Sequence, residues 1–462
     1  MWTWSLIEIF PQTLPIQMEV ASTLGVLAAS SAGLPAAIIG VGALPAAIAA
    51  ARGKLIETPI AFLGLSFVFF YGISAFGALL RGLDSSPTFI AAGLTAIYGL
   101  FASYVGYLVL RSPARSVAAS LPVFKEPWKL GRLRLVQGVL LTLGTVGLAA
   151  RFIAAGTFTT GEGVAPAALQ TDRISEANWS VPLLLAHGVA LVIWLALIRR
   201  NGTKRDLRFW ILGAALYVAV YALVGSRSRI LFAFVPAFGV FHLTGRGRKT
   251  WRPIVGLIVA LAAYIGYGQV RDTIFLESPI RAKTSSIEDY IANHGDLMVF
   301  RATMDVMDRY PVYRDFTNGS TLVVPVTNWV PRSVWPEKPL PASAVYTSIF
   351  DPRAWDRGVT AVVGLIGELY MNGGHGVVLI GMFVLGGLLR LLGEYRNLAR
   401  GNTGVDVLYS LMILPVATLA RGDLAFVFFN AETSLAIAVG CLVFFSGLRK
   451  NAPSSTSIVR RE

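Results

Sequence analysis

Five arginines from four separate segments are the side chains of this sequence best suited to bind an anionic substrate. Arg227 and Arg229 separate two apolar segments, Arg271 ends the next one, Arg332 follows a proline, and Arg421 begins a short polar turn. A guanidinium keeps its charge when it is buried and binds phosphate oxygens through two parallel hydrogen bonds. The sequence therefore predicts a phosphate or diphosphate site. The alternative is that each arginine extends to water or pairs with a nearby acid.

Glu368 is the candidate for acid or base chemistry. It lies in a short apolar segment, 359–371, which two glycines follow and which is expected to be a half-helix that enters the outer leaflet of a membrane. Partial desolvation makes a carboxylate a stronger base. His375 is the second candidate for this base. An ion pair with an arginine explains Glu368 equally well, and Asp423 and Glu432 are weaker candidates because both stand near an arginine.

Aromatic and polar side chains close to these groups are candidates for carbohydrate binding. We predict Trp335, Lys338 and Asn372 as glycan-binding residues. Trp329 and Trp355 are also able to stack on sugar rings, although anchoring at the interface is the commoner role of tryptophan beside a bilayer. The sequence leaves both roles open for the tryptophans.

Several other kinds of site are excluded by the residues present. The single cysteine, Cys441, rules out intrachain disulfides and thiolate metal clusters. The four histidines show no metal-ligand spacing, and the residue order of a phosphate-binding loop is broken. No Asp-x-Asp pair occurs between residues 271 and 358. We therefore expect no metal and no cofactor.

Composition assigns the chain to the polytopic membrane proteins. Of its 462 residues, 55% are hydrophobic and 14% are charged, and its mean hydropathy is +0.62, too apolar for a soluble protein of this length. A spanning helix needs about 20 mainly apolar residues. We predict an all-α fold, with one transmembrane domain over residues 1–462 and about eleven spans. The spans lie near 20–50, 57–80, 88–110, 133–155, 179–198, 209–225, 228–243, 253–270, 374–392, 404–420 and 431–447.

The polar stretch 271–358 is predicted to form one large external loop that contains short helices. Within it, residues 296–309 carry apolar side chains at helical spacing, which predicts an amphipathic helix that packs on the membrane domain or lies in the interface. The opposite loops hold most of the lysines and arginines, so the positive-inside rule places them, with the carboxyl terminus, in the cytoplasm. These loops lie near 51–57, 111–134, 199–208, 244–252, 390–406 and after 448.

The net charge of +14 is therefore a signal of membrane topology, which anionic membrane lipids reinforce. It requires no nucleic-acid partner.

Short motifs spread over residues 225–430 resemble a known family. They are Gly225-Ser226-Arg227, Arg309-Tyr310-Pro311, Gly319-Ser320-Thr321, Pro331-Arg332, Trp335-Pro336-Glu337-Lys338-Pro339, Gly367-Glu368-Leu369-Tyr370-Met371-Asn372-Gly373-Gly374 with Gly376, and Arg421. Together they resemble the signature of the Wzy-type oligosaccharide repeat-unit polymerases, which include the O-antigen polymerases. The first 200 residues share only the hydropathy of that family.

The resemblance implies a glycosyltransferase of the bacterial inner membrane. Its substrate is an undecaprenyl-diphosphate-linked oligosaccharide, whose growing glycan is transferred to the next lipid-linked repeat unit on the periplasmic or outer side. A chain-length regulator and a flippase are the implied partners. Three alternatives stay open: an O-antigen ligase, a glycosyltransferase that uses polyprenyl-phosphate sugars, and a lipid-linked oligosaccharide flippase.

Overall fold

The structure is a computed structural model that describes residues 30–155, 180–201, 204–223, 227–244, 291, 297–330, 332–356 and 360–450, and most of these residues are helical. Among these residues the only strands are β1 (Val123–Phe124) and β2 (Leu448–Arg449), which pair antiparallel. The predicted all-α class is confirmed.

The helices of the amino-terminal half are α2 (Leu34–Ala51), η1 (Leu55–Glu57), α3 (Pro59–Phe67), η2 (Val68–Gly72), α4 (Ile73–Leu80), η3 (Leu83–Ser85), α5 (Pro87–Val109), α6 (Arg111–Ser120), α7 (Leu130–Ala155), α9 (Ser180–Asn201), α10 (Lys204–Leu223) and α11 (Arg227–Leu243). The helices that follow are α14 (Val299–Arg309), α15 (Ser320–Thr327), α16 (Ala342–Phe350), α17 (Pro352–Asp356), α18 (Gly364–Leu398), α19 (Thr403–Thr418) and α20 (Leu424–Ser446).

Seven of the described helices are long and apolar enough to cross a membrane: α2, the continuous helix formed by α3, η2 and α4, and α5, α7, α9, α18 and α20. Two further apolar helices, within α11 and α19, are shorter. The first turn of α10 is rich in charged residues, which lowers its mean hydropathy. The predicted span 253–270 lies outside the described residues. Length and composition are therefore those of a polytopic membrane protein.

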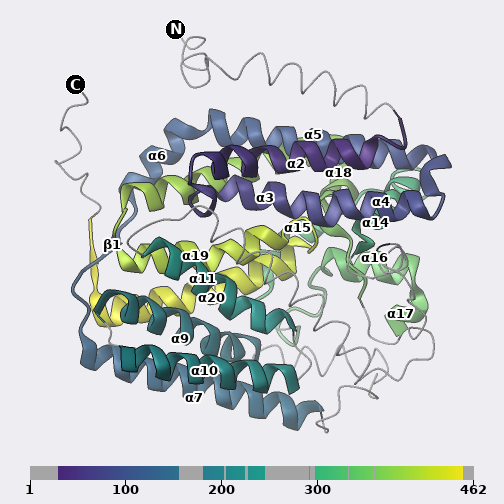
Figure 1. Ribbon diagram of the computed structural model, residues 1–462. Coiled ribbons are helices and arrows are strands. Elements are labelled where there is room, and N and C mark those ends of the chain that lie inside the picture. Colours follow the sequence, from purple (N-terminus) through teal and green to yellow (C-terminus); the bar gives the residue numbers. More distant parts are fainter. Residues whose placement is uncertain are drawn as a thin grey trace, which may run out of the picture.

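The helices lie roughly parallel to one another in layers (Figure 1). One apolar core joins α2, α3, α4 and α5 to α14, α18 and α19, and a second joins α7, α9, α11, α19 and α20. Helices α5 and α18 approach closely, because Gly106 and Gly386 each face a backbone carbonyl of the other helix where a Cβ would overlap it. Small residues permit such contact between membrane helices.

Loops predicted to share the cytoplasmic side lie together at one end of the helices. Arg396, which is 1% exposed, forms ion pairs with Glu57 at 2.9 Å and with Asp406 at 3.3 Å. Glu126 pairs with Arg200 and accepts a hydrogen bond from the backbone of residue 403. The β1–β2 pair joins the loop after α6 to the segment after α20. Charged groups from four of these loops therefore meet at this end.

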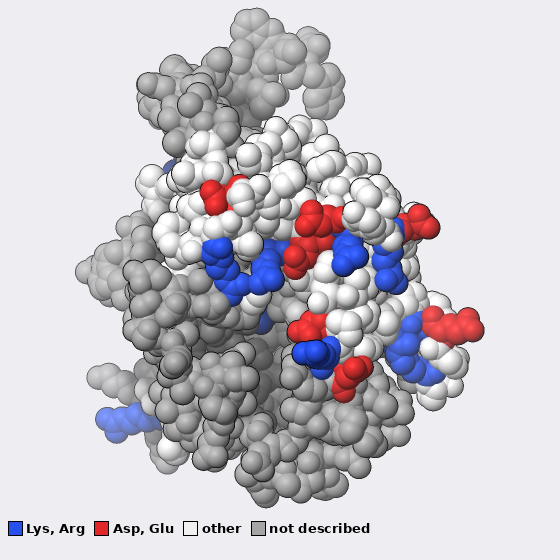
Figure 2. Space-filling view, turned by 90° about the vertical axis from the view of Figure 1, so that its right-hand side faces the viewer, with Lys and Arg blue, Asp and Glu red and all other residues white. Residues whose placement is uncertain are grey.

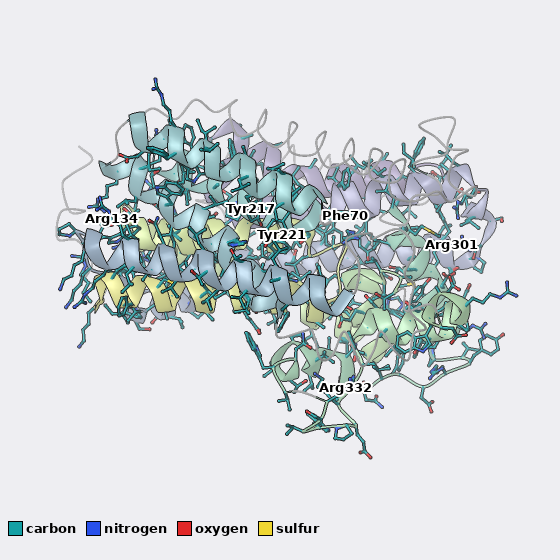
Figure 3. All side chains as sticks on the ribbon, turned by 90° about the horizontal axis from the view of Figure 1, so that it is seen from below. Phe70, Arg134, Tyr217, Tyr221, Arg301 and Arg332 are labelled. Carbon is teal, nitrogen blue, oxygen red and sulfur yellow. The ribbon has the colours of Figure 1, made fainter. Side chains whose placement is uncertain are left out.

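The two ends of the molecule carry different groups. Arg134 lies at the end that holds the ion pairs, and Arg301 lies at the far end (Figure 3). Arg332 lies in a part of the chain that projects beyond the long helices. Helices α14, α16 and α17 lie at the far end (Figure 1). The described motifs that begin at Arg309 and at Arg332 therefore belong to the end opposite the ion pairs.

Candidate functional site

The predicted amphipathic helix is present as α14 and packs on the long helices. Phe300 is fully buried, and its ring meets that of Phe89 of α5 at 5.2 Å between centroids. Met304 and Met307 are also buried. The hydroxyl of Ser74 donates to the carbonyl of residue 297 and accepts from the backbone N–H of Phe300 at 3.0 Å. The prediction for residues 296–309 is confirmed, with the α-helix starting at Val299.

Helix α18 breaks where the sequence predicts the end of a half-helix. Gly373 and Gly374 leave the helical conformation, and Gly374 has a φ of 67°, which favours glycine. A Cβ at Gly374 would also press on the ring of Phe316 at 3.2 Å. The first nine residues of α18 therefore form a separate short helix that presents Glu368 and Asn372.

The Glu368 carboxylate is fully buried, and both of its oxygens accept hydrogen bonds. The backbone N–H of Leu424, the first residue of α20, donates to Oε2 at 2.6 Å. The hydroxyl of Thr321 in α15 donates to Oε1 at 3.2 Å. The positive end of the α20 dipole favours a carboxylate at this place. Among the described residues, the partners of Glu368 are thus a helix terminus and a hydroxyl rather than an arginine.

A chain of buried hydrogen bonds continues from Glu368 to the start of α15. The Asn372 amide nitrogen donates to Thr321 Oγ1 at 2.7 Å and to the carbonyl of Glu368 at 2.7 Å. The hydroxyl of Thr317 donates to the Asn372 amide oxygen at 2.7 Å. Asn372 is 3% exposed, so it supports the site from within and lies apart from any surface where a glycan would bind.

Asp423 joins two helix starts beside Glu368. Its Oδ1 caps α20 by accepting from the backbone N–H of Phe426 at 2.8 Å, and its Oδ2 accepts from the N–H of Ser343 in α16 at 3.1 Å. Arg421 is half-buried two residues earlier in the same turn. Helices α15, α16, α18 and α20 therefore meet at one junction, which we call the Glu368 junction.

His375 lies in different surroundings. It follows the break in α18 and is exposed. Its Nδ1 lies 3.2 Å from the hydroxyl of Thr95 in α5, and its ring meets that of Tyr370 edge-on at 5.1 Å. The two predicted bases, Glu368 and His375, therefore have no hydrogen-bond partner in common among the described residues.

Arg332 and Lys338 stabilise the proline-rich segment between Val330 and Pro339, which we call the braced segment, through hydrogen bonds to its own carbonyls. The Arg332 guanidinium donates to the carbonyls of Lys338 at 2.9 Å and Pro336 at 3.2 Å, and the Lys338 ammonium donates to the carbonyl of Val330 at 2.9 Å. Burial and the neighbouring charge of Arg332 lower the pKa of Lys338. Both cations therefore have a structural role that their sequence positions do not reveal.

The tryptophans differ in their surroundings. Trp335 is 38% exposed at the tip of the braced segment, where a sugar ring has access to it. Trp329 donates to Glu432 Oε2 at 3.3 Å and packs on Phe429 of α20 at 5.2 Å. Trp329 and Glu432 therefore anchor the end of α15 to α20, whereas Trp335 is exposed to solvent.

The predicted cluster of five arginines is only partly described. Arg227 begins α11 and Arg229 lies in its first turn, but their side chains lie outside the description. Arg271 lies outside the described residues. Arg332 and Arg421 belong to two different parts of the far end, the braced segment and the turn before α20.

An acid that the sequence did not single out lies closer to the surface than Glu368. Asp305 of α14 is half-buried, and its Oδ2 accepts a hydrogen bond from the Tyr346 hydroxyl at 2.7 Å. Burial raises the pKa of Asp305, and the Tyr346 hydrogen bond partly offsets this shift. The only signal in the sequence is its place on the polar face of the amphipathic helix, because Tyr346 is far along the chain.

No protein-family model, no curated protein and no solved structure matches the chain. The role of this arrangement is therefore inferred from its own residues.

Proposed function

We propose that this protein is a Wzy-type glycosyltransferase that polymerises undecaprenyl-diphosphate-linked oligosaccharide repeat units. The observation that supports it most is the Glu368 junction. Three segments that carry the resemblance to this family meet there through hydrogen bonds. Thr321, at the end of the first, contacts Glu368 and Asn372 of the second. The backbone of Leu424, directly after the turn that starts at Arg421, donates to Glu368. Such convergence is expected if the shared motifs build one active region.

The proposed reaction forms one glycosidic bond and breaks one bond to phosphate. A hydroxyl of the acceptor sugar attacks the anomeric carbon of the donor glycan. The bond from that carbon to the diphosphate oxygen breaks, and undecaprenyl diphosphate leaves. The acceptor hydroxyl gives its proton to a base, while cationic side chains stabilise the charge that develops on the leaving group.

Asp305 suits the role of base better than Glu368. A general base must come within hydrogen-bond distance of the proton that it takes. Glu368 is fully buried with both oxygens engaged, whereas Asp305 of α14 is only half-buried and has a raised pKa. We therefore assign Glu368 to positioning α18 and α20, and Asp305 to proton transfer.

The proposal includes a topology of eleven spans in the bacterial inner membrane, with residues 271–358 on the periplasmic side. In a Cys441→Ser background, a cysteine at Ser333 is expected to react with a membrane-impermeant thiol reagent in intact spheroplasts. A cysteine at Ser120 is expected to react only after permeabilisation. Both positions are exposed, so accessibility of the side chain does not differ between them. The opposite labelling pattern would contradict the proposed orientation in the membrane.

An O-antigen ligase is the second candidate, since it uses the same lipid-diphosphate donor and differs in its acceptor. The test is a glycan gel of a strain that lacks the gene. Loss of polymerisation leaves caps of a single repeat unit, loss of ligation leaves uncapped core, and a lost flippase leaves no repeat unit on the outer side. We expect single-repeat caps, and a ladder after complementation. Uncapped core would contradict the polymerase proposal and support a ligase.

A further inference from the structure

An apolar groove runs between α7 and α20 and has a volume of about 280 Å³. Helix α7 lies at an edge of the molecule (Figure 1), and three of the lining side chains, Leu135, Val139 and Phe444, are at least half exposed. The groove therefore opens outward. The residues that line it are Leu135, Val136, Val139 and Leu140 of α7 and Gly440, Cys441 and Phe444 of α20.

The groove is a fixed feature of the packing between two spanning helices. A Cβ added at Gly440 would meet no atom within 4 Å, so the missing side chain leaves this space open. Behind the groove, Val136 and Leu140 are buried in the core that they share with Leu442 and Phe445. The shape of the groove therefore depends on packed helices.

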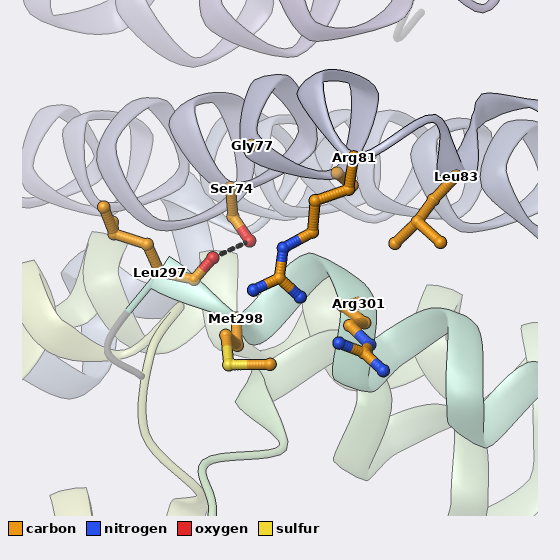
Figure 4. Close-up of a pocket in the computed structure, with 8 residues that line it drawn as sticks. Ser74, Gly77, Arg81, Leu83, Leu297, Met298 and Arg301 are labelled. Carbon is orange, nitrogen blue, oxygen red and sulfur yellow. Dashed lines mark hydrogen bonds between the residues drawn. The ribbon is translucent and has the colours of Figure 1, made fainter. Parts of the chain in front are cut away.

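The size of the groove suits a segment of hydrocarbon chain. The hollow between α4 and α14, where Arg81 approaches Arg301 (Figure 4), holds only about 10 Å³, which is room for about one water molecule. The groove between α7 and α20 is many times larger, and its lining offers a water molecule few polar partners. A hydrocarbon chain is therefore a better occupant than water.

The depth of the groove places it within one leaflet of the membrane. The apolar span of α7 begins at Gly131. Leu135 and Leu140 follow it by four and nine residues, which is about 6 and 14 Å along a helix that rises 1.5 Å per residue. Half of the hydrocarbon core is about 15 Å thick. The groove therefore reaches from the interface towards the middle of the bilayer.

Two cations stand where the groove meets the interface. Arg132 lies one turn before Leu135 on α7, so the two side chains share a face of the helix. Its guanidinium donates to the carbonyl of Phe444 at 3.3 Å and lies 5.8 Å from the centre of the Phe444 ring. The backbone N–H of Lys129 donates to the carbonyl of Phe445 at 3.4 Å. Arg132 and Lys129 are both exposed, and their remaining donors face solvent.

The positive charge around these two cations is unbalanced. The sequence holds a single acid in 121–134 and none in 446–450, and this acid, Glu126, pairs with Arg200. Among the described residues, neither Lys129 nor Arg132 has an acidic side chain within ion-pair distance. At the far end of the molecule, by contrast, basic and acidic side chains lie interspersed (Figure 2). The exposed cations near the groove are Lys125, Lys129, Arg132, Arg134, Arg449 and Lys450, and Figure 3 shows Arg134 at this end.

We propose that the groove between α7 and α20 binds an anionic phospholipid, with one acyl chain in the groove and the phosphate on Arg132 and Lys129. Basic side chains beside a spanning helix attract anionic headgroups. A zwitterionic phospholipid offers the same chains, but its own cation offsets the charge of the phosphate. The basic mouth of the groove therefore selects the anionic lipid, and the apolar groove holds its chain.

The headgroup is tested by lipid binding to the purified full-length protein in a neutral detergent, measured by native mass spectrometry. Phosphatidylglycerol is expected to bind more tightly than phosphatidylcholine with the same chains. Arg132→Gln and Lys129→Gln should each weaken binding of phosphatidylglycerol about fivefold, the scale of one basic side chain at an anionic lipid surface. Arg115→Gln is the matched control, because Arg115 is exposed on α6, at the edge of the molecule opposite α7 (Figure 1). It should bind as the wild type.

The acyl chain is tested by filling the groove. Gly440→Leu places a side chain in open space, so it is expected to keep the thermal stability of the wild type and to weaken binding about tenfold, the loss expected when about two methylene groups leave an apolar site. Gly138→Leu is the matched control, since Gly138 is exposed on α7, also has open space around its Cβ position and lies outside the groove. Phosphatidylglycerol with a photoactivatable acyl chain should cross-link to residues 135–140 and 440–444.

Three results would overturn the proposal. The first is equal binding of the two phospholipids together with unchanged binding in both glutamine variants. The second is cross-linking only outside the groove, with normal binding by Gly440→Leu. The third is efficient dimer formation by a thiol-specific cross-linker at Cys441, unaffected by phosphatidylglycerol, which would assign the groove to a second copy of the chain. The assay contains no glycan substrate, so its outcome is independent of the proposed polymerase activity.

Discussion

Replacement of Arg396 by methionine is expected to be the most destabilising single change at the end of the molecule that holds the ion pairs. Arg396 is 1% exposed and forms ion pairs with Glu57 and Asp406, whose side chains are 4% and 5% exposed. Removing one partner of a buried pair leaves an uncompensated charge in a low-dielectric environment. The expected loss is about 3–5 kcal/mol in the free energy of unfolding.

Equilibrium unfolding in mixed detergent micelles measures this loss. Arg400→Met is the matched control, because Arg400 contacts the same Glu57 carboxylate at 2.7 Å but is 52% exposed. Exposed pairs contribute about 0–1 kcal/mol, so Arg400→Met should change stability little. Equal losses for the two variants would mean that the charges at this end are solvated, in contradiction to the packing described here.

Replacement of Glu368 by alanine is expected to abolish polymer and to destabilise the far end of the molecule. The change leaves the Leu424 N–H and the Thr321 hydroxyl without their acceptor, at a cost of about 1–3 kcal/mol for each group. Glu368→Gln keeps the shape and one acceptor oxygen, so we expect near-normal stability and an activity within about tenfold of the wild type, far from the loss of about 100-fold or more that removal of a general base brings.

Thermal unfolding and the glycan ladder are the two measurements for these variants. Thr321→Val is a companion variant that removes two hydrogen bonds of the same junction, the one to Glu368 and the one from Asn372, and leaves the carboxylate in place. Its polymer yield should fall between those of the glutamine and alanine variants. A stable Glu368→Gln protein without any polymer would show that the carboxylate itself takes part in the chemistry, and would return the role of base to Glu368.

Local patterns in the sequence were enough to predict the helices and several features of the far end. The apolar spacing of Phe300, Met304 and Met307 predicted a helix packed on the membrane domain, and the two glycines after Asn372 predicted the break in α18. Both features follow from the intrinsic properties of residues close together in the chain, so they need no knowledge of the rest of the fold.

Contacts between distant segments could not be predicted in the same way. The bond between Tyr346 and Asp305, the approach of Arg81 to Arg301, and the ion pair of Arg396 with Glu57 join segments that meet only through helix packing. A polar residue in such a segment looks the same in the sequence whether it is solvated or buried. For that reason Glu368 was predicted as a partly desolvated base with access to substrate, although its carboxylate is enclosed by α15 and α20.

In the braced segment, the hydrogen-bond partners of two cations could not be predicted either, although these partners lie close by in the sequence. Arg332 was predicted to bind phosphate because a guanidinium binds phosphate oxygens bidentately, and Lys338 was predicted to bind a glycan. In the structure both side chains donate to backbone carbonyls of residues 330–339. A segment rich in proline has few backbone N–H groups with which to pair its carbonyls, so nearby cations satisfy them.

The most direct measurement of the central claim is polymer formation by the purified protein. Undecaprenyl-diphosphate-linked repeat units are the only substrate in a first reaction, a second reaction also contains a lipid A core acceptor, and the products of both are separated on a glycan gel. The account predicts a ladder of repeat units with release of undecaprenyl diphosphate, and loss of the ladder in Asp305→Asn with thermal stability near that of the wild type. Repeat units that stay single with the wild-type protein, while they are transferred to an added lipid A core acceptor, would contradict it.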